Sequence, residues 1–138
     1  MNYDPLDLMI AADDAEALGG LMYDANSHAR TRNPACERLA EKLFAAQIVP
    51  AEAMPGHFVR LGSAVTYAEV PRGARRTLRV VAPQLADANE GRVSVLSPIG
   101  CALLGHGVGA VVDVQLPNGS SMQVRLDEVE HAAALSAA

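Results

Sequence analysis

A Ser-Pro step inside an apolar stretch rich in glycine constrains the fold of this chain more than any other feature. The stretch runs from Val93 to Gly109 and reads Val-Ser-Val-Leu-Ser-Pro-Ile-Gly-Cys-Ala-Leu-Leu-Gly-His-Gly-Val-Gly. Ser97 suits a helix N-cap, and Pro98 suits the first helical position, because its fixed φ matches the helix and no N–H is needed there. Gly105 is a natural helix end. We therefore expect a strand, one short apolar helix and a second strand.

Alternating apolar and polar residues, which are typical of strands, surround this stretch. The expected strands are residues 63–69, 76–82, 92–96, 110–116 and 121–130. Asn118-Gly119 accepts the positive φ angles of a tight hairpin turn. Leu103 and Leu104 would bury the short helix against the strands. The pattern predicts an α+β fold with a strongly bent antiparallel sheet and one short helix across it.

The first third of the chain has helical spacing instead. Asp13 is the expected cap of a first helix, with Glu16 three residues later, and Asn33-Pro34 marks a second helix start after a polar turn at residues 26–33. Apolar residues at helical spacing are Ala15, Leu18, Leu21, Met22 and Ala25, then Ala35, Leu39, Leu43 and Ala46. Two short helices joined by a short turn predict an antiparallel helical hairpin.

A segment with two prolines and a glycine separates these two patterns. It spans residues 47–56 and contains Pro50, Pro55 and Gly56, so we expect a linker there. The expected units are residues 1–55, a helical hairpin with its linker, and residues 56–138, a sheet domain. A length of 138 residues suits one domain with a small appendage.

The charge is unevenly placed along the chain. Residues 1–55 hold nine acidic and four basic side chains, whereas residues 56–138 hold seven of each, within a net charge of −5. Direct nucleic-acid binding needs a concentrated positive field, which this balance does not supply. The one local basic cluster consists of Arg72, Arg75, Arg76 and Arg79. It is either a solvated hairpin face or a contact for an acidic partner.

No residue pattern points to a cofactor, a metal ion or a catalytic centre. Cys36 and Cys101 are far apart and read as reduced thiols. The four histidines have no metal-ligand spacing. The glycines at 105, 107 and 109 lie between a helix and a strand, the reverse of the order in a dinucleotide site. With no signal sequence after Met1 and no apolar run of about 20 residues, a cytoplasmic chain that does not enter a membrane is expected.

The segment from Ser97 to Gly105 resembles the Ser-Pro-Ile/Leu-Gly-x-Ala-Leu-Leu-Gly stretch in the C-terminal domain of Gre transcript-cleavage factors. Within this superfamily the closer resemblance is to the Rnk regulators of nucleoside diphosphate kinase. The resemblance runs from about Ala12 to His131, is strong from Ser63 to Glu130, and includes Met54-Pro55. It implies that the sheet domain is FKBP-like and that the helical hairpin is a short coiled coil.

The resemblance also implies a partner, RNA polymerase, near its secondary channel. Paired acidic residues at the hairpin tip of Gre factors help to hold magnesium in the polymerase active centre. Here residues 22–33 hold one carboxylate, Asp24, beside Arg30 and Arg32, which is a poor magnesium site. The resemblance therefore implies a monomeric, non-enzymatic regulator without cofactors that competes with Gre factors without stimulating cleavage, and an effect on nucleoside diphosphate kinase through regulation.

Ser97, Pro98 and Ile99 are the expected docking residues, because an exposed apolar turn with proline is preorganised for a contact. Gly100 and Leu103 are expected to support this turn from beneath. Three alternatives stay open: the polymerase-binding module, a module of the same fold with another protein partner, and an enzyme that stimulates cleavage or isomerises proline. The FKBP-like pocket of an isomerase depends on an aromatic lining, whereas this chain has no tryptophan.

Overall fold

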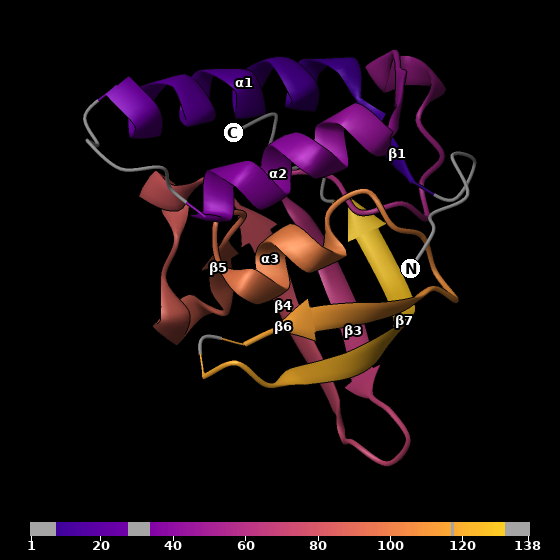
Figure 1. Cartoon of the computed structure of the whole chain (residues 1–138). Helices are drawn as coiled ribbons and strands as arrows, with labels where there is room; N and C mark the ends of the chain where they lie inside the picture. Colours follow the sequence, from indigo (N-terminus) through magenta and orange to yellow (C-terminus); the bar gives the residue numbers. More distant parts are fainter. Residues whose placement is uncertain (1–7, 28–33, 117, 132–138) are drawn as a thin grey trace.

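A helical layer covers one side of a curled sheet in the computed structural model, which describes residues 8–27, 34–116 and 118–131 (for 23–27, 34, 35 and 131, the backbone only). The helices are α1 (Ala12–Ser27), α2 (Pro34–Ala45) and α3 (Pro98–Leu103). Figure 1 shows α2 between α1 and α3, and α3 also contacts the sheet. The contacts therefore run in series from α1 to α2, from α2 to α3, and from α3 to the sheet.

The main sheet has five strands in the order β5-β4-β3-β7-β6. Their bounds are β3 (Ser63–Glu69), β4 (Arg75–Val81), β5 (Arg92–Ser94), β6 (Val111–Gln115) and β7 (Ser121–His131). All five expected strands are present; four lie within one residue of their expected bounds, and β5 ends at Ser94, two residues before its expected end. The predicted α+β class is confirmed.

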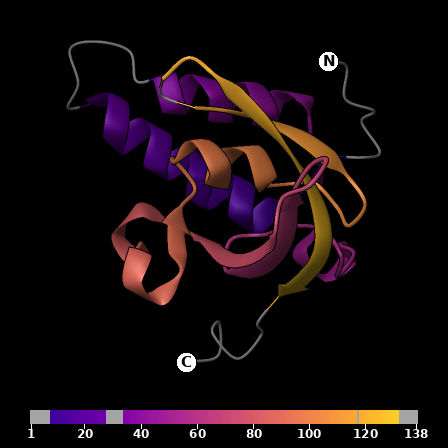
Figure 2. The same cartoon turned by 90° about the horizontal axis from the view of Figure 1, so that it is seen from below.

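The curl of the sheet centres on the long strand β7. Its residues 121–125 pair with β6 and its residues 124–131 pair with β3, with a register shift between Thr66 and Tyr67 of β3. Figure 2 shows β7 bending along its length. A strand that serves two neighbours over different parts of its length, with a bulge in one of them, bends the sheet around its core.

The prediction of a purely antiparallel sheet is wrong at one edge. Strand β5 pairs with β4 in parallel, from Arg79 opposite Arg92 to Val81 opposite Ser94. The loop between these strands contains two short 3-10 helices, η3 (Pro83–Leu85) and η4 (Ala88–Glu90). This loop carries the chain back along the sheet edge, so β5 runs in the same direction as β4, and its first residue, Arg92, lies opposite Arg79 in the second half of β4.

The expected linker at residues 47–56 is also more structured than predicted. Strand β2 (Gln47–Val49) pairs in parallel with β1 (Met9–Ala11), and a 3-10 turn, η2 (Ala51–Ala53), follows it. Each strand has three residues, too few to show a period in the sequence. Their pairing joins the segment before α1 to the segment after α2.

The first helix begins earlier than expected. Asp13 lies inside α1 rather than at its cap, because the chain passes directly from β1 at Ala11 into the helix at Ala12. Helix α2 begins at Pro34 as expected. The turn of the predicted hairpin falls in residues 28–33, outside the described residues, so the antiparallel hairpin and its coiled coil stay predictions, as does the FKBP-like detail.

One core joins the helical layer to the sheet. Ile10, Leu18 and Leu39 from the first third of the chain belong to the same buried cluster as the sheet residues. The other fully buried large side chains of this cluster are Val59, Val65, Val80, Val95, Leu103, Leu104, Val114, Val124 and Leu126. Leu103 and Leu104 are therefore buried as predicted. Among the described residues, no helix is long and apolar enough to cross a membrane.

Candidate docking site

The start of α3 is fixed by its own serine. The Ser97 hydroxyl accepts a hydrogen bond from Gly100 N at 3.1 Å and donates one to Ser94 O at 2.6 Å. The predicted N-cap with proline at the first helical position is confirmed. Gly100 is required here, because a Cβ at this position would collide with the Ser94 carbonyl oxygen. The sequence from Ser94 to Gly100 therefore specifies one rigid turn.

The predicted docking residues are less exposed than expected. Ser97, Pro98 and Ile99 are each partly buried. The Ser97 hydroxyl already has two partners within the turn, and Ile99 packs against the buried core. Pro98 is the member of the three that lines an open groove. Their assignment as polymerase contacts stays a prediction, and Pro98 is the residue best placed for it.

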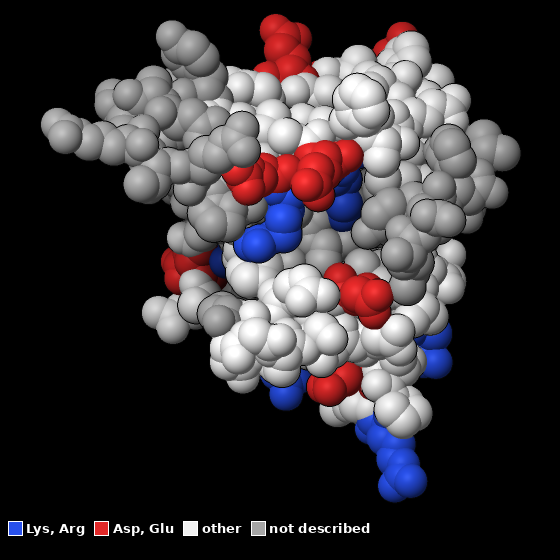
Figure 3. Space-filling view, viewed as in Figure 1, with Lys and Arg blue, Asp and Glu red and all other residues white. Residues whose placement is uncertain are grey.

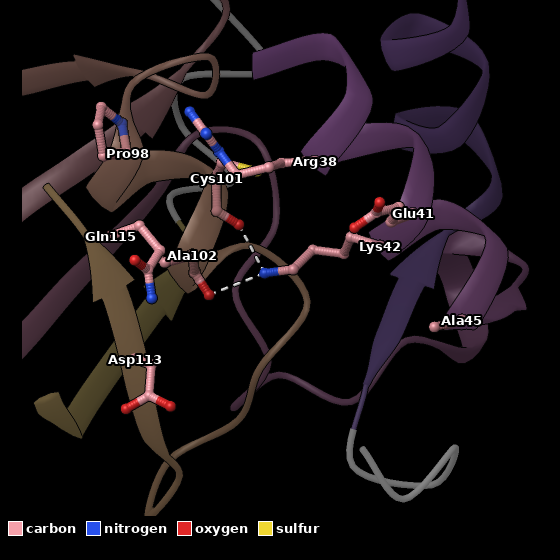
Figure 4. A pocket seen from close by; sticks show the side chains of 9 residues that line it. All are labelled: Arg38, Glu41, Lys42, Ala45, Pro98, Cys101, Ala102, Asp113 and Gln115. Atoms are coloured by element: carbon pink, nitrogen blue, oxygen red, sulfur yellow. Dashed lines mark hydrogen bonds between the residues drawn. The ribbon is translucent and has the colours of Figure 1, made fainter. Parts of the chain in front are cut away.

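The end of α3 is held by a lysine from another helix. Lys42 of α2 is the only lysine in the sequence and is buried. Its Nζ donates to the carbonyl oxygens of Cys101 at 2.5 Å and Ala102 at 2.8 Å (Figure 4). It also donates to the carbonyl oxygen of Leu104 at 2.8 Å. A cation at a helix C-terminus satisfies carbonyls that have no partner within the helix. Lys42 therefore fixes α2 to the end of α3.

Burial changes the protonation behaviour of two groups near this contact. Burial lowers the pKa of Lys42 to about 8, although the nearby Cys101 acts in the opposite direction. Burial, and then repulsion by the Lys42 ammonium, lowers the pKa of His106 to about 3. His106 is therefore a neutral core residue at physiological pH.

A carboxylate makes a second tie between the helical layer and the sheet. Asp14 of α1 accepts a hydrogen bond from Leu61 N at 3.1 Å, and its Oδ2 lies 3.8 Å from Arg60 Nε. Burial raises the pKa of Asp14, against the opposing effect of the Leu61 hydrogen bond. The first turn of α1 is thereby attached to the segment that leads into β3.

A groove of about 410 Å³ opens between α2, α3 and β6. Its lining residues are Arg38, Glu41, Lys42 and Ala45 from α2, Pro98, Cys101 and Ala102 from α3, and Asp113 and Gln115 from β6. Figure 4 shows the α2 side chains facing those of α3 and β6 across it. In Figure 3 acidic and basic side chains border the hollow on the helical side, and an acidic side chain stands on the sheet side. The groove thus combines charged rims with small apolar residues.

The predicted hairpin-tip residues lie partly or wholly outside the described residues. Asp24 lies in the last turns of α1 rather than in a turn, and the structure describes only its backbone. Arg30 and Arg32 lie outside the described residues. Their role at a hairpin tip therefore stays a prediction.

The predicted basic cluster is divided among separate contacts. Arg75 lies 3.3 Å from Asp127 and 3.8 Å from Glu128, and Arg79 donates to Gly62 O at 2.5 Å. Arg72 and Arg76 are exposed near the end of the β3–β4 hairpin. Arg79 is therefore held by the fold, Arg75 makes ion pairs while largely exposed, and Arg72 and Arg76 are exposed.

Sequence reasoning missed the α2 side of the groove. One feature of the sequence could have drawn attention to Lys42: it is the only lysine, and it lies beside the apolar positions Leu39 and Leu43. A lysine placed beside an apolar stripe either extends its amine to solvent or finds carbonyl partners within the protein. Which of the two holds depends on α3, about sixty residues later, and so could not be read from the local sequence.

The structure is an α+β module in which a helical layer covers one side of a curled sheet, with a groove between α2, α3 and β6. Residues 54–131 match the family model for the C-terminal domain of the GreA/GreB transcription elongation factors. The transcription elongation factor GreA of Brucella anthropi is 30% identical over 115 residues, which cover 80% of this chain and 73% of that protein. The chain belongs to the GreA/GreB transcription elongation factor family.

Two further comparisons define the extent of the similarity. The GreA of Macrococcus caseolyticus is 45% identical over 71 residues, and the chain spans 45% of that protein's length. Among solved structures, a GreA/GreB factor from Nitrosomonas europaea is 29% identical with a TM-score of 0.71. That similarity covers 90% of this chain and 98% of the solved one. The similarity to the solved structure therefore includes the helical layer as well as the sheet.

Proposed function

We propose that this chain is a non-enzymatic, monomeric regulator of the Rnk type that binds RNA polymerase at the rim of its secondary channel. The observation that carries the proposal is the rigid turn before α3, with Pro98 at its surface, in a domain of the GreA/GreB family. A turn that is already fixed in the free protein loses little conformational freedom on binding. The sheet domain makes the contact, and the helical layer points toward the channel.

The same regulator competes with Gre factors and does not stimulate transcript cleavage. Residues 22–33 contain a single carboxylate, Asp24, and two arginines, Arg30 and Arg32. Metal-assisted hydrolysis requires several oxygen ligands close together around the ion. An effect on nucleoside diphosphate kinase follows from regulation of its synthesis rather than from direct catalysis.

A retention assay with core RNA polymerase tests the contact. The immobilised full chain should retain the polymerase, and Pro98→Asp should reduce retention at least tenfold, because it places a charge at the contact while keeping an acceptable first helical residue. Leu85→Asp is the matched control, since Leu85 is 57% exposed in η3 and outside the groove. Ile99 is left unchanged because it packs against the core.

The outcomes separate the open alternatives. Retention by the wild type and the Leu85 variant, but not by the Pro98 variant, supports the assigned surface. Failure of the wild type to retain polymerase would instead favour a module of the same fold with another protein partner. Thermal melting of each variant distinguishes a lost contact from a lost fold.

A further inference from the structure

Strand β6 ends the main sheet and leaves one side of its backbone without a strand partner among the described residues. Leu126 N donates to Ala110 O and Leu116 N donates to Ser120 O, both at 2.9 Å, on either side of β6. In an antiparallel ladder the hydrogen-bonded positions alternate. The backbone N–H and C=O groups of Val112 and Val114 therefore point toward β7. Those of the alternate residues point away from the sheet. These outward residues are Val111, Asp113 and Gln115.

The groove described above lies along this backbone edge. Two of the three outward residues, Asp113 and Gln115, line it. Its opposite wall consists of α2 and α3, where Ala45, Pro98 and Ala102 provide small apolar surface. An added strand would lie about 4.8 Å from β6, with alternate side chains directed toward or away from that surface. The groove volume of about 410 Å³ is within the ordinary range of binding clefts, about 300–1,000 Å³.

The charged side chains along the groove indicate which kind of segment could pair with β6. Asp113 is exposed, and its carboxylate accepts a hydrogen bond from Gln123 Nε2 at 3.0 Å, which fixes its position on the sheet. Glu41 adds a second exposed carboxylate on the α2 side, with Arg38 beside it. If β6 paired with β6 of a second molecule about a two-fold axis, the pairing that uses all the outward backbone groups would place Asp113 opposite Asp113 of the other molecule. Like charges directly opposite each other destabilise a strand pair, whereas opposite charges stabilise it.

We propose that the outward edge of β6 binds an extended segment of a partner protein, which adds a sixth strand to the sheet with a basic side chain opposite Asp113. Backbone hydrogen bonds to Val111, Asp113 and Gln115 would provide affinity for any extended segment. The pairing of a basic side chain with Asp113 would provide specificity. Edge strands in monomeric proteins are commonly protected by charges or bulges, and β6 has one charge, Asp113, within its five residues. Pro98 lines this groove as well, so the added strand would lie beside the proposed polymerase contact, but its binding to β6 does not require the polymerase.

Nuclear magnetic resonance of the labelled full chain tests this proposal with two synthetic peptides. The probe is an acetylated, amidated peptide Thr-Val-Arg-Val-Thr, and the matched control peptide has glutamate in place of arginine. The arginine peptide should shift the amide signals of Val111, Asp113 and Gln115, slow their hydrogen exchange, and bind at least tenfold more tightly than the glutamate peptide. Shifts confined to other elements, or no shifts at millimolar peptide, would overturn the proposal.

Two variants separate the backbone contribution from the charge. Asp113→Pro removes the outward N–H, which takes no part in the pairing with β7, so the sheet should persist while peptide binding is lost. Asp113→Asn keeps the N–H, so binding should persist with a reduced preference for arginine. Unchanged binding by a folded Asp113→Pro variant would contradict the proposal; if that variant does not fold, an unchanged arginine preference in Asp113→Asn would contradict it. Sedimentation that shows concentration-dependent dimerisation through β6 would mean that a second molecule of this chain occupies the edge. That result would also contradict the proposal.

Discussion

At the scale of single residues, the sequence was most informative where one side chain interacts with its own neighbourhood. The Ser97 cap and the proline at position 98 depend on atoms within a few residues, and the structure places both as expected. Asp13 shows the limit of this reasoning, because its role as a cap depended on where β1 ends. Lys42 and Asp14 were missed because their partners are distant in sequence.

Gly100 and Gly20 allow a matched test of local packing. Gly100→Ala should lower the free energy of unfolding by about 1–3 kcal/mol, because the new Cβ collides with Ser94 O in a well-packed turn. Gly20→Ala in α1 should instead raise it by about 0.5–1 kcal/mol, since nothing lies within 4 Å of the added methyl group and alanine favours a helix. Urea unfolding measures both. A change of the same sign in both variants would contradict the described packing.

His106 should make the folded state sensitive to acid. In the unfolded chain His106 takes up a proton near its ordinary pKa of 6.5, whereas in the folded chain its pKa is about 3. The unfolded state therefore binds more protons between these values, and the free energy of unfolding falls as pH falls through this range. The expected contribution is about 2 kcal/mol between pH 6.5 and 5.0, at about 1.4 kcal/mol per pH unit.

Urea unfolding at several pH values measures this contribution. His106→Gln, which cannot titrate, should show a flatter dependence on pH than the wild type. His57→Gln is the matched control for the substitution itself, because His57 is an exposed histidine. Equal slopes in the wild type and the His106 variant would show that the His106 ring is not kept neutral by burial.

At the scale of elements, strand and helix positions were predictable where a period of two or 3.6 extends over five or more residues. Strand β3 and the start of α2 match their expected bounds. Strands β1 and β2, with three residues each, have no visible period and pair across both helices. The parallel pairing of β5 with β4 was missed for a related reason, because strand direction depends on the path of the loop at 82–91 and not on the strand residues.

The contact between α2 and α3 depends on Lys42. Lys42→Met should lower the free energy of unfolding by about 2–4 kcal/mol, because the buried carbonyl oxygens of Cys101, Ala102 and Leu104 lose a shared charged donor. Arg38→Met, one turn earlier on the same helix and exposed, should change it by less than about 0.5 kcal/mol. Denaturant unfolding of the two variants decides the matter, and equal small effects would mean that the lysine does not hold α3.

At the scale of the whole molecule, the helical layer and the sheet share a core and two polar ties. Lys42 joins α2 to α3, and Asp14 joins α1 to the segment before β3. Such ties fix the direction in which the helical layer points relative to the turn at Pro98. The sequence predicted both parts and the family, but not the groove, because its walls come from three segments far apart in the chain.

A transcript-cleavage assay on stalled elongation complexes, with magnesium present, tests the central claim most directly. Each reaction contains a fixed amount of a Gre factor, the full chain over a range of concentrations, or both. The chain alone should produce no cleavage above the intrinsic level, and in the mixture it should reduce Gre-stimulated cleavage in proportion to its concentration. Cleavage stimulated by the chain alone, or Gre-stimulated cleavage that remains unchanged at a large excess of the chain, would contradict the account.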